Sequence, residues 1–136
     1  MPRKTDSNNP ADWLFIALTD LEGLHRLATD EIAYAMCRSK LAEVLEKGIK
    51  AELIRTGWPL EKTHDLGKLY ELLKGNNPSL ASTTGSLCDD LAEAYFTDRY
   101  PGFDLEDADW PKLREQIKEV EALLIAVKAN LPQSPS

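Results

Sequence analysis

The fold is decided by residues 31–66, which read EIAYAMCRSKLAEVLEKGIKAELIRTGWPLEKTHDL. Apolar residues recur there every three or four positions from Ile32 to Ile54, which is the period of an amphipathic helix. Charged residues occupy the other positions and include two glutamate–lysine pairs with the i,i+4 spacing that stabilises helices, Glu43–Lys47 and Glu46–Lys50. The pattern predicts one long helix with one buried face and one exposed, charged face.

The end of this long helix is marked by turn residues. Gly57 suits a C-terminal cap, because glycine adopts the left-handed conformation without a side-chain clash, and Trp58-Pro59 prevents the helix from continuing. Thr63 is the predicted N-cap of a shorter helix that follows. The core face of that helix consists of Leu66, Leu69, Tyr70 and Leu73.

The remaining segments also have helical periodicity. Asn9 and Pro10 are typical of a helix start, and the helix they open is expected to run to about residue 28. Residues 78–85 have a linker composition, residues 87–98 predict a fourth helix, and Asp109 is expected to cap the last one. The apolar positions of the last helix are Leu113, Ile117, Val120, Leu124, Val127 and Leu131. Because no segment alternates apolar and polar residues as a strand would, we predict an all-α, up-and-down four-helix bundle with an additional short helix.

The overall composition fits one soluble domain. At 136 residues the chain can bury one core, and we expect a bundle over residues 9–131 with disordered tails at 1–8 and 132–136. A net charge of −7 gives no chain-wide attraction for nucleic acid, although a local basic face can exist. The polar N-terminus and the lack of an apolar run of roughly 18 residues predict a cytoplasmic protein without a membrane span.

Metal and cofactor motifs are missing from the sequence. The two histidines, His25 and His64, stand in no zinc-ligand spacing, and no P-loop, G-x-S-x-G or G-x-G-x-x-G run is present. The acidic residues near Asp89 and in the 104–109 loop read as solvated surface. We therefore expect no metal and no cofactor.

Two short stretches carry side chains that suit a phosphate, and each has two interpretations. Around Lys62, Thr63 and His64, the residues either cap a helix or form an anion pocket at its N-terminus. Arg99 either stabilises the C-terminal end of the fourth helix or clamps a phosphate beside Tyr100. The local sequence leaves both interpretations open.

Taken together, three runs resemble the HEPN-domain family. They are LEKGIKA at 45–51, KTHDL at 62–66, and Tyr95 followed by RYP at 99–101. The resemblance covers roughly residues 11–130 and implies a helical bundle that dimerises, with RNA or a nucleotide as its ligand. It also implies pairing with a minimal nucleotidyltransferase in toxin–antitoxin or related defence modules.

Active members of this family are metal-independent endoribonucleases with an R-x(4–6)-H motif, and this chain departs from that pattern. No histidine follows Arg99 at the required spacing, and eight residues separate Arg55 from His64. We therefore expect a non-catalytic nucleotide- or RNA-binding protein with a site at Lys62, Thr63, His64, Arg99 and Tyr100. The alternatives are a metal-independent endoribonuclease that uses His64 and Arg99, or a purely structural interaction bundle.

The last helix has more apolar surface than one seam requires. Leu123, Ile125 and Ala126 extend it. This extra surface predicts either deeper burial inside the bundle or the face of a homodimer.

Overall fold

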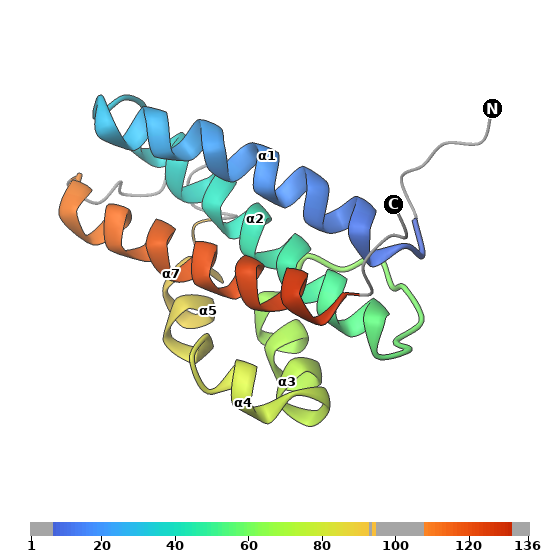
Figure 1. The fold of residues 1–136 in the computed structure, drawn as a ribbon. Helices are drawn as coiled ribbons and strands as arrows, with labels where there is room; N and C mark the ends of the chain where they lie inside the picture. The colour runs from blue at the N-terminus through green and yellow to red at the C-terminus, as the bar shows by residue number, and fades with distance from the viewer. Residues whose placement is uncertain (1–6, 93, 95–107, 132–136) are drawn as a thin grey trace.

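The structure is a computed structural model that describes residues 7–92, 94 and 108–131. Its three long helices are α1 (Pro10–Thr29), α2 (Tyr34–Arg55) and α7 (Trp110–Asn130). The shorter helices are α3 (Leu66–Asn76), α4 (Pro78–Ala81) and α5 (Gly85–Ala92), and no strand occurs in the described part of the chain (Figure 1). The predicted all-α bundle is confirmed.

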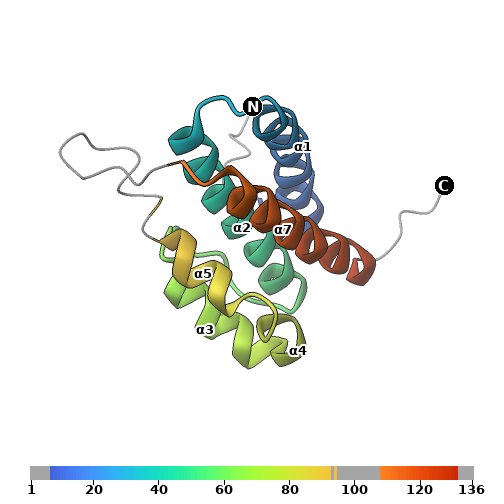
Figure 2. The ribbon, with the colours of Figure 1, turned by 90° about the vertical axis from the view of Figure 1, so that its left-hand side faces the viewer.

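Helix α2 is the central element of the bundle. It packs against α1, α7, α3 and α5. Figure 2 shows α3, α4 and α5 gathered on one side of α2, with α1 and α7 on the other. The predicted exposed, charged face of this helix is therefore wrong, since Glu46, Lys50 and Glu52 are all buried. The sequence pattern assumes one buried face, whereas a helix with neighbours on several sides buries most of its circumference.

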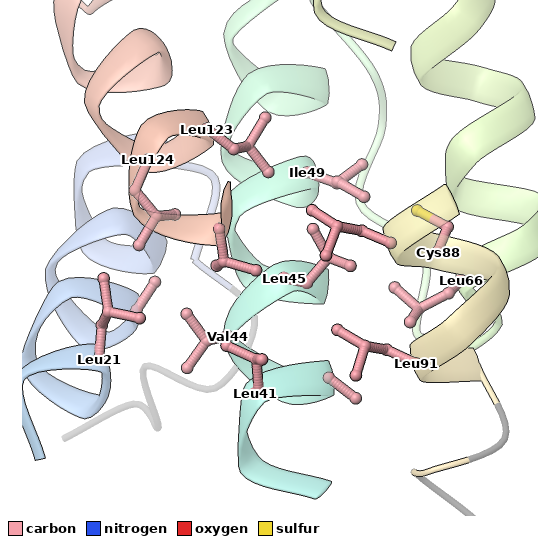
Figure 3. Close-up of a cluster of buried hydrophobic side chains, with 14 of the residues drawn as sticks. Leu21, Leu41, Val44, Leu45, Ile49, Leu66, Cys88, Leu91, Leu123 and Leu124 are labelled. Carbon is pink, nitrogen blue, oxygen red and sulfur yellow. The ribbon is translucent and has the colours of Figure 1, made fainter. Parts of the chain in front are cut away.

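The hydrophobic core surrounds α2. Leucines from α1, α3, α5 and α7 converge on the apolar side chains of α2 (Figure 3). Gly48 allows α7 to approach closely, because a Cβ atom at this position would lie 2.6 Å from Cδ2 of Leu124. The absence of a side chain at Gly48 thus sets the distance between the two helices.

The predicted glycine cap at the end of α2 is confirmed. Gly57 has a φ of 101°, its amide donates to the carbonyl of Ile54 at 3.0 Å, and the amide of Trp58 donates to the carbonyl of Leu53 at 2.9 Å. These two bonds form a Schellman motif. The chain leaves α2 in a fixed direction and enters the loop that leads to α3.

The start of α2 differs from the prediction. The helix begins at Tyr34, after a turn in which Glu31 and Ala33 both have positive φ. Arg114 of α7 donates to the carbonyl of Ala28 at 2.9 Å and pairs with the Glu31 carboxylate at 3.2 Å. This tertiary contact holds the strained turn in place, and it could not be seen from local sequence.

The start of α3 differs as well, because its N-cap is Asp65 and not Thr63. The Asp65 carboxylate accepts the amide of Lys68 at 3.2 Å, and the Thr63 hydroxyl accepts the amide of Asp65 at the same distance. Thr63 therefore supports the cap from outside the helix.

The predicted linker at residues 78–85 contains helix α4. Asn77 is its N-cap and accepts the amide of Leu80 at 3.1 Å, and Pro78 occupies its first turn. Asparagine followed by proline is a helix-start signal, and it prevails here over the linker composition of residues 78–85.

Helix α7 begins where it was predicted to begin, with Asp109 accepting the amide of Lys112 at 3.1 Å. Its predicted apolar seam is buried from Leu113 to Val127. Leu123 is buried too, whereas Ile125 is 60% exposed. Part of the extra apolar surface of α7 is therefore buried in the core, and part of it is exposed.

Candidate ligand-binding cavity

A cavity of about 370 Å³ lies between α1, α2 and the loop that joins α2 to α3. It is lined by Trp13, Glu46, Lys47, Lys50, Leu60, Glu61, Lys62 and His64. Three lysines and a histidine thus surround one concave space, together with two glutamates and one tryptophan. We call it the first cavity.

The floor of the first cavity is a buried ion pair. The Lys50 ammonium lies 3.1 Å from the Glu46 carboxylate, and their side chains are only 4% and 5% exposed. The Lys50 Nζ also lies 5.3 Å from the centre of the Trp13 ring, which favours a cation over its face. A buried charge requires such partners, since desolvation without them is costly.

His64 brings the loop onto this floor. Its Nδ1 lies 3.0 and 3.2 Å from the two carboxylate oxygens of Glu46, and its side chain is 60% exposed. The carboxylate fixes the orientation of the imidazole, so that the Nε2 edge is directed away from Glu46. Glu46 is thereby shared between a buried lysine and an accessible histidine.

The local sequence explains how these groups come together. Glu46 and Lys50 stand four residues apart and so lie on one face of α2. The capped turn at Gly57 reverses the chain and returns His64 to Glu46. On the α1 side, the indole N–H of Trp13 donates to the carbonyl of Ser7 at 2.8 Å.

The sequence was compared with models of protein families, with curated proteins and with solved structures. The family model of the HEPN domain matches residues 10–130. The chain belongs to the HEPN family. No curated protein and no solved structure matches it. All the side chains that line the first cavity lie within the matched span.

Two of the predicted site residues of this HEPN protein, Lys62 and His64, line the first cavity. Thr63 lies between them in sequence, and its hydroxyl accepts a hydrogen bond from the Asp65 amide. The amide of Lys68 donates to Asp65, so the chain's own side chains occupy the start of α3. Any anion site here therefore depends on the lysines and the histidine more than on the helix terminus.

Two other predicted site residues, Arg99 and Tyr100, lie outside the described residues. So do Tyr95 and the end of the predicted fourth helix.

The sequence analysis did not predict six residues of the first cavity: Leu60, Glu61, Trp13, Glu46, Lys47 and Lys50. The last three belong to the LEKGIKA run that carried the HEPN resemblance. The predicted turn at Gly57 was the signal that could have revealed them, because it reverses the chain and brings the KTHDL run back to the LEKGIKA run.

The described residues, 7–92, 94 and 108–131, bear on metal binding and on membrane insertion. No group of three or more His, Cys, Asp and Glu side chains there is placed to hold a metal ion. No helix in those ranges has the length and apolar character needed to cross a membrane.

Proposed function

We propose that this HEPN protein binds the phosphate of a nucleotide or RNA in the first cavity and acts without catalysis, as the cytoplasmic partner of a minimal nucleotidyltransferase in a toxin–antitoxin or defence module. The observation that carries the proposal is the gathering of Lys47, Lys62 and His64 around one cavity above the Glu46–Lys50 pair. Arg99 and Tyr100 are included in the proposed site on the resemblance alone.

The charges in the first cavity favour an anion. Glu46 offsets the charge of Lys50, and Glu61 pairs with Lys68 at 2.8 Å. Lys47 and Lys62 line the same space, and an ammonium is a common partner of phosphate in proteins. The volume of about 370 Å³ lies in the range of small-molecule sites, roughly 300–1,000 Å³.

The test measures the affinity of the protein for ATP and for a short single-stranded RNA. Lys47→Ala and Lys62→Ala should each weaken binding about tenfold, since each removes a charge-assisted contact to phosphate. The control is Lys118→Ala, which removes an exposed lysine of α7 that does not line the cavity. Unchanged affinity in both cavity variants would show that the site is wrong.

Arg99→Ala and Tyr100→Phe extend the test to the two residues that enter the proposed site on the resemblance. Loss of affinity in Arg99→Ala would support its phosphate role. Unchanged affinity would remove both residues from the site and leave the cavity lysines in it.

The absence of an R-x(4–6)-H motif supports the non-catalytic assignment. A specific observation favours the second candidate, a metal-independent endoribonuclease: the Glu46 carboxylate orients His64, as a group that transfers a proton from a ribose 2′-hydroxyl would need. Incubation with total RNA in EDTA separates the two functions. Cleavage that disappears in His64→Ala would overturn the non-catalytic assignment, and intact RNA supports it.

The proposal includes a homodimer and a partner protein. Two exposed apolar side chains, Phe15 on α1 and Ile125 on α7, support a protein–protein surface. Ile125→Asp should shift the protein from dimer to monomer in light scattering. A monomeric wild-type protein would contradict the dimer, and failure to co-purify with the nucleotidyltransferase would contradict the partner.

A further inference from the structure

A second cavity, of about 580 Å³, adjoins the first. It is lined by Asn8, Ile54, Gly57, Trp58, Pro59, Leu60 and Lys62. Leu60 and Lys62 line both cavities, so these two loop residues stand where one cavity meets the other.

The two cavities differ in chemistry. The first is lined mainly by ionisable residues, among them the Glu46–Lys50 pair, Lys47 and His64. The second is lined mainly by uncharged residues, and Lys62 is the only cationic side chain among the described residues that line it. Each contains one tryptophan, Trp13 in the first and Trp58 in the second.

Both volumes fall in the range of a small-molecule site, about 300–1,000 Å³. One nucleotide would therefore occupy one cavity and leave the other empty. Tryptophan rings stack on unpaired bases with little sequence preference, and lysines beside them hold the backbone. An aromatic ring in each cavity with a lysine between them suits two successive nucleosides joined by a phosphate.

We infer that the ligand of this HEPN protein is single-stranded RNA that crosses both cavities, with one base at Trp13, the next at Trp58, and the phosphate between them at Lys62. The inference rests on the proposed function and specifies its ligand. Asn8 also lines the second cavity, and a side-chain amide can both donate to and accept from the edge of a base.

The experiment compares two probes that differ by one nucleoside: uridine 3′,5′-bisphosphate and the dinucleotide pUpU. Both carry two phosphate groups, and pUpU has the lower negative charge because its internal phosphate is a diester. Tighter binding of pUpU must therefore come from the second nucleoside and not from added charge. The wild-type protein should bind pUpU at least about tenfold more tightly, as expected for one added base–aromatic stack. Extension to a tetranucleotide should add only a small gain.

The variants Trp58→Leu and Trp58→Phe assign this gain to the second cavity. Trp58→Leu should abolish the preference for pUpU and leave the affinity for the bisphosphate unchanged, whereas Trp58→Phe should keep most of the preference because it retains a ring. Trp58 packs partly against the core, so thermal unfolding is used to confirm that both variants fold. The probe comparison on the wild-type protein needs no variant.

The outcomes separate the two proposals. Equal affinity of the wild-type protein for both probes would overturn the two-cavity inference and leave the phosphate site intact. Binding of neither probe would overturn the proposed function itself. A preference for pUpU that persists in Trp58→Leu would also overturn the assignment of the second base to Trp58.

Discussion

Helix α2 carries two buried glutamates, Glu46 and Glu52, with different surroundings. The Glu52 side chain is fully buried, and one of its oxygens accepts from the amides of Asn77 and Asn130, each at 3.1 Å. Its other oxygen is paired with Arg55. These partners come from α2, from the junction of α3 and α4, and from the last turn of α7, so Glu52 joins three parts of the bundle.

Glu46 is surrounded in another way. Its partners are Lys50 and His64, and all three side chains line the first cavity. At 3.6 residues per turn, Glu46 and Glu52 point about 120° apart around the helix axis. Burial of a charge therefore does not by itself mark a site. The difference lies in whether its partners close the space around it or face a cavity.

The largest expected effect is the loss of stability in Glu52→Ala. The substitution leaves Arg55 and two amide groups without their acceptor and should lower the free energy of unfolding by about 3 kcal/mol. Urea unfolding followed by circular dichroism measures the change. Glu52→Gln is the control, since it keeps one carbonyl oxygen and should lose less. Equal stability of Glu52→Ala and the wild-type protein would show that Glu52 does not join the three parts.

The next effect is expected on the other side of the helix, in the double variant Glu46→Gln/Lys50→Met. Replacing both partners of a buried ion pair leaves no uncompensated charge, so stability should change by less than about 1.5 kcal/mol. Ligand affinity should fall, because His64 loses the carboxylate that orients it. The single variant Glu46→Ala should be less stable than the double variant, since it leaves Lys50 buried without its counter-ion. An unchanged ligand affinity in a folded double variant would show that Glu46, like Glu52, only stabilises the fold.

The sequence predicted those parts of the fold that depend on local signals. The cap at Gly57, the start of α7 at Asp109 and the apolar seam of α7 follow from residues within one or two turns of each other. The late start of α2 depends on Arg114, which comes from the other end of the chain. Such a contact leaves no local pattern.

The candidate site was predicted in part for the same reason. Lys62 and His64 were found because they stand beside a helix start, where phosphates commonly bind. Glu46 and Lys50 were interpreted as a surface pair, because i,i+4 spacing on a helix gives the same pattern whether the pair is exposed or buried. Only the position of α2 at the centre of the bundle distinguishes the two cases.

Two helix glycines, Gly48 on α2 and Gly23 on α1, are expected to respond to alanine in opposite ways. Nothing lies within 4 Å of a Cβ atom added at Gly23, so Gly23→Ala should stabilise the protein by about 1 kcal/mol through helix propensity. Gly48→Ala should instead destabilise it by about 1 kcal/mol, since a Cβ atom there contacts buried Leu124 and pushes α7 away.

The Gly48 variant also separates the two sides of α2. Displacement of α7 lengthens the contact from Asn130 to Glu52, whereas the first cavity contains no residue of α7. Unfolding experiments should therefore show lower stability of Gly48→Ala, and binding experiments should show unchanged ligand affinity. Equal stabilisation by the two alanine substitutions would show that α7 adapts to the added methyl group at no cost.

The smallest expected effect concerns Cys88 of α5, on the side of α2 opposite to α1. Burial, with a smaller contribution from the negative charge of Asp89, raises the pKa of its thiol to about 12 from 9.0. Because the folded pKa is the higher one, the stabilisation is complete below about pH 9 and is lost as the pH rises toward 12. At pH 8 the native thiol should react with iodoacetamide only when the bundle opens, since the thiolate is the nucleophile.

Cys88 then reports which side of α2 has loosened. Peptide mass spectrometry should show faster alkylation of Cys88 in Glu52→Ala, because that variant weakens the joint between α2, α3 and α7 and so raises the population of open molecules. The Glu46→Gln/Lys50→Met variant should alkylate at the wild-type rate, since its change faces the cavity. Rapid alkylation of the wild-type protein at pH 8 would contradict the closed packing of α5 on α2. Equal acceleration in the two variants would contradict the division of α2 into a closed side and a side that faces the ligand.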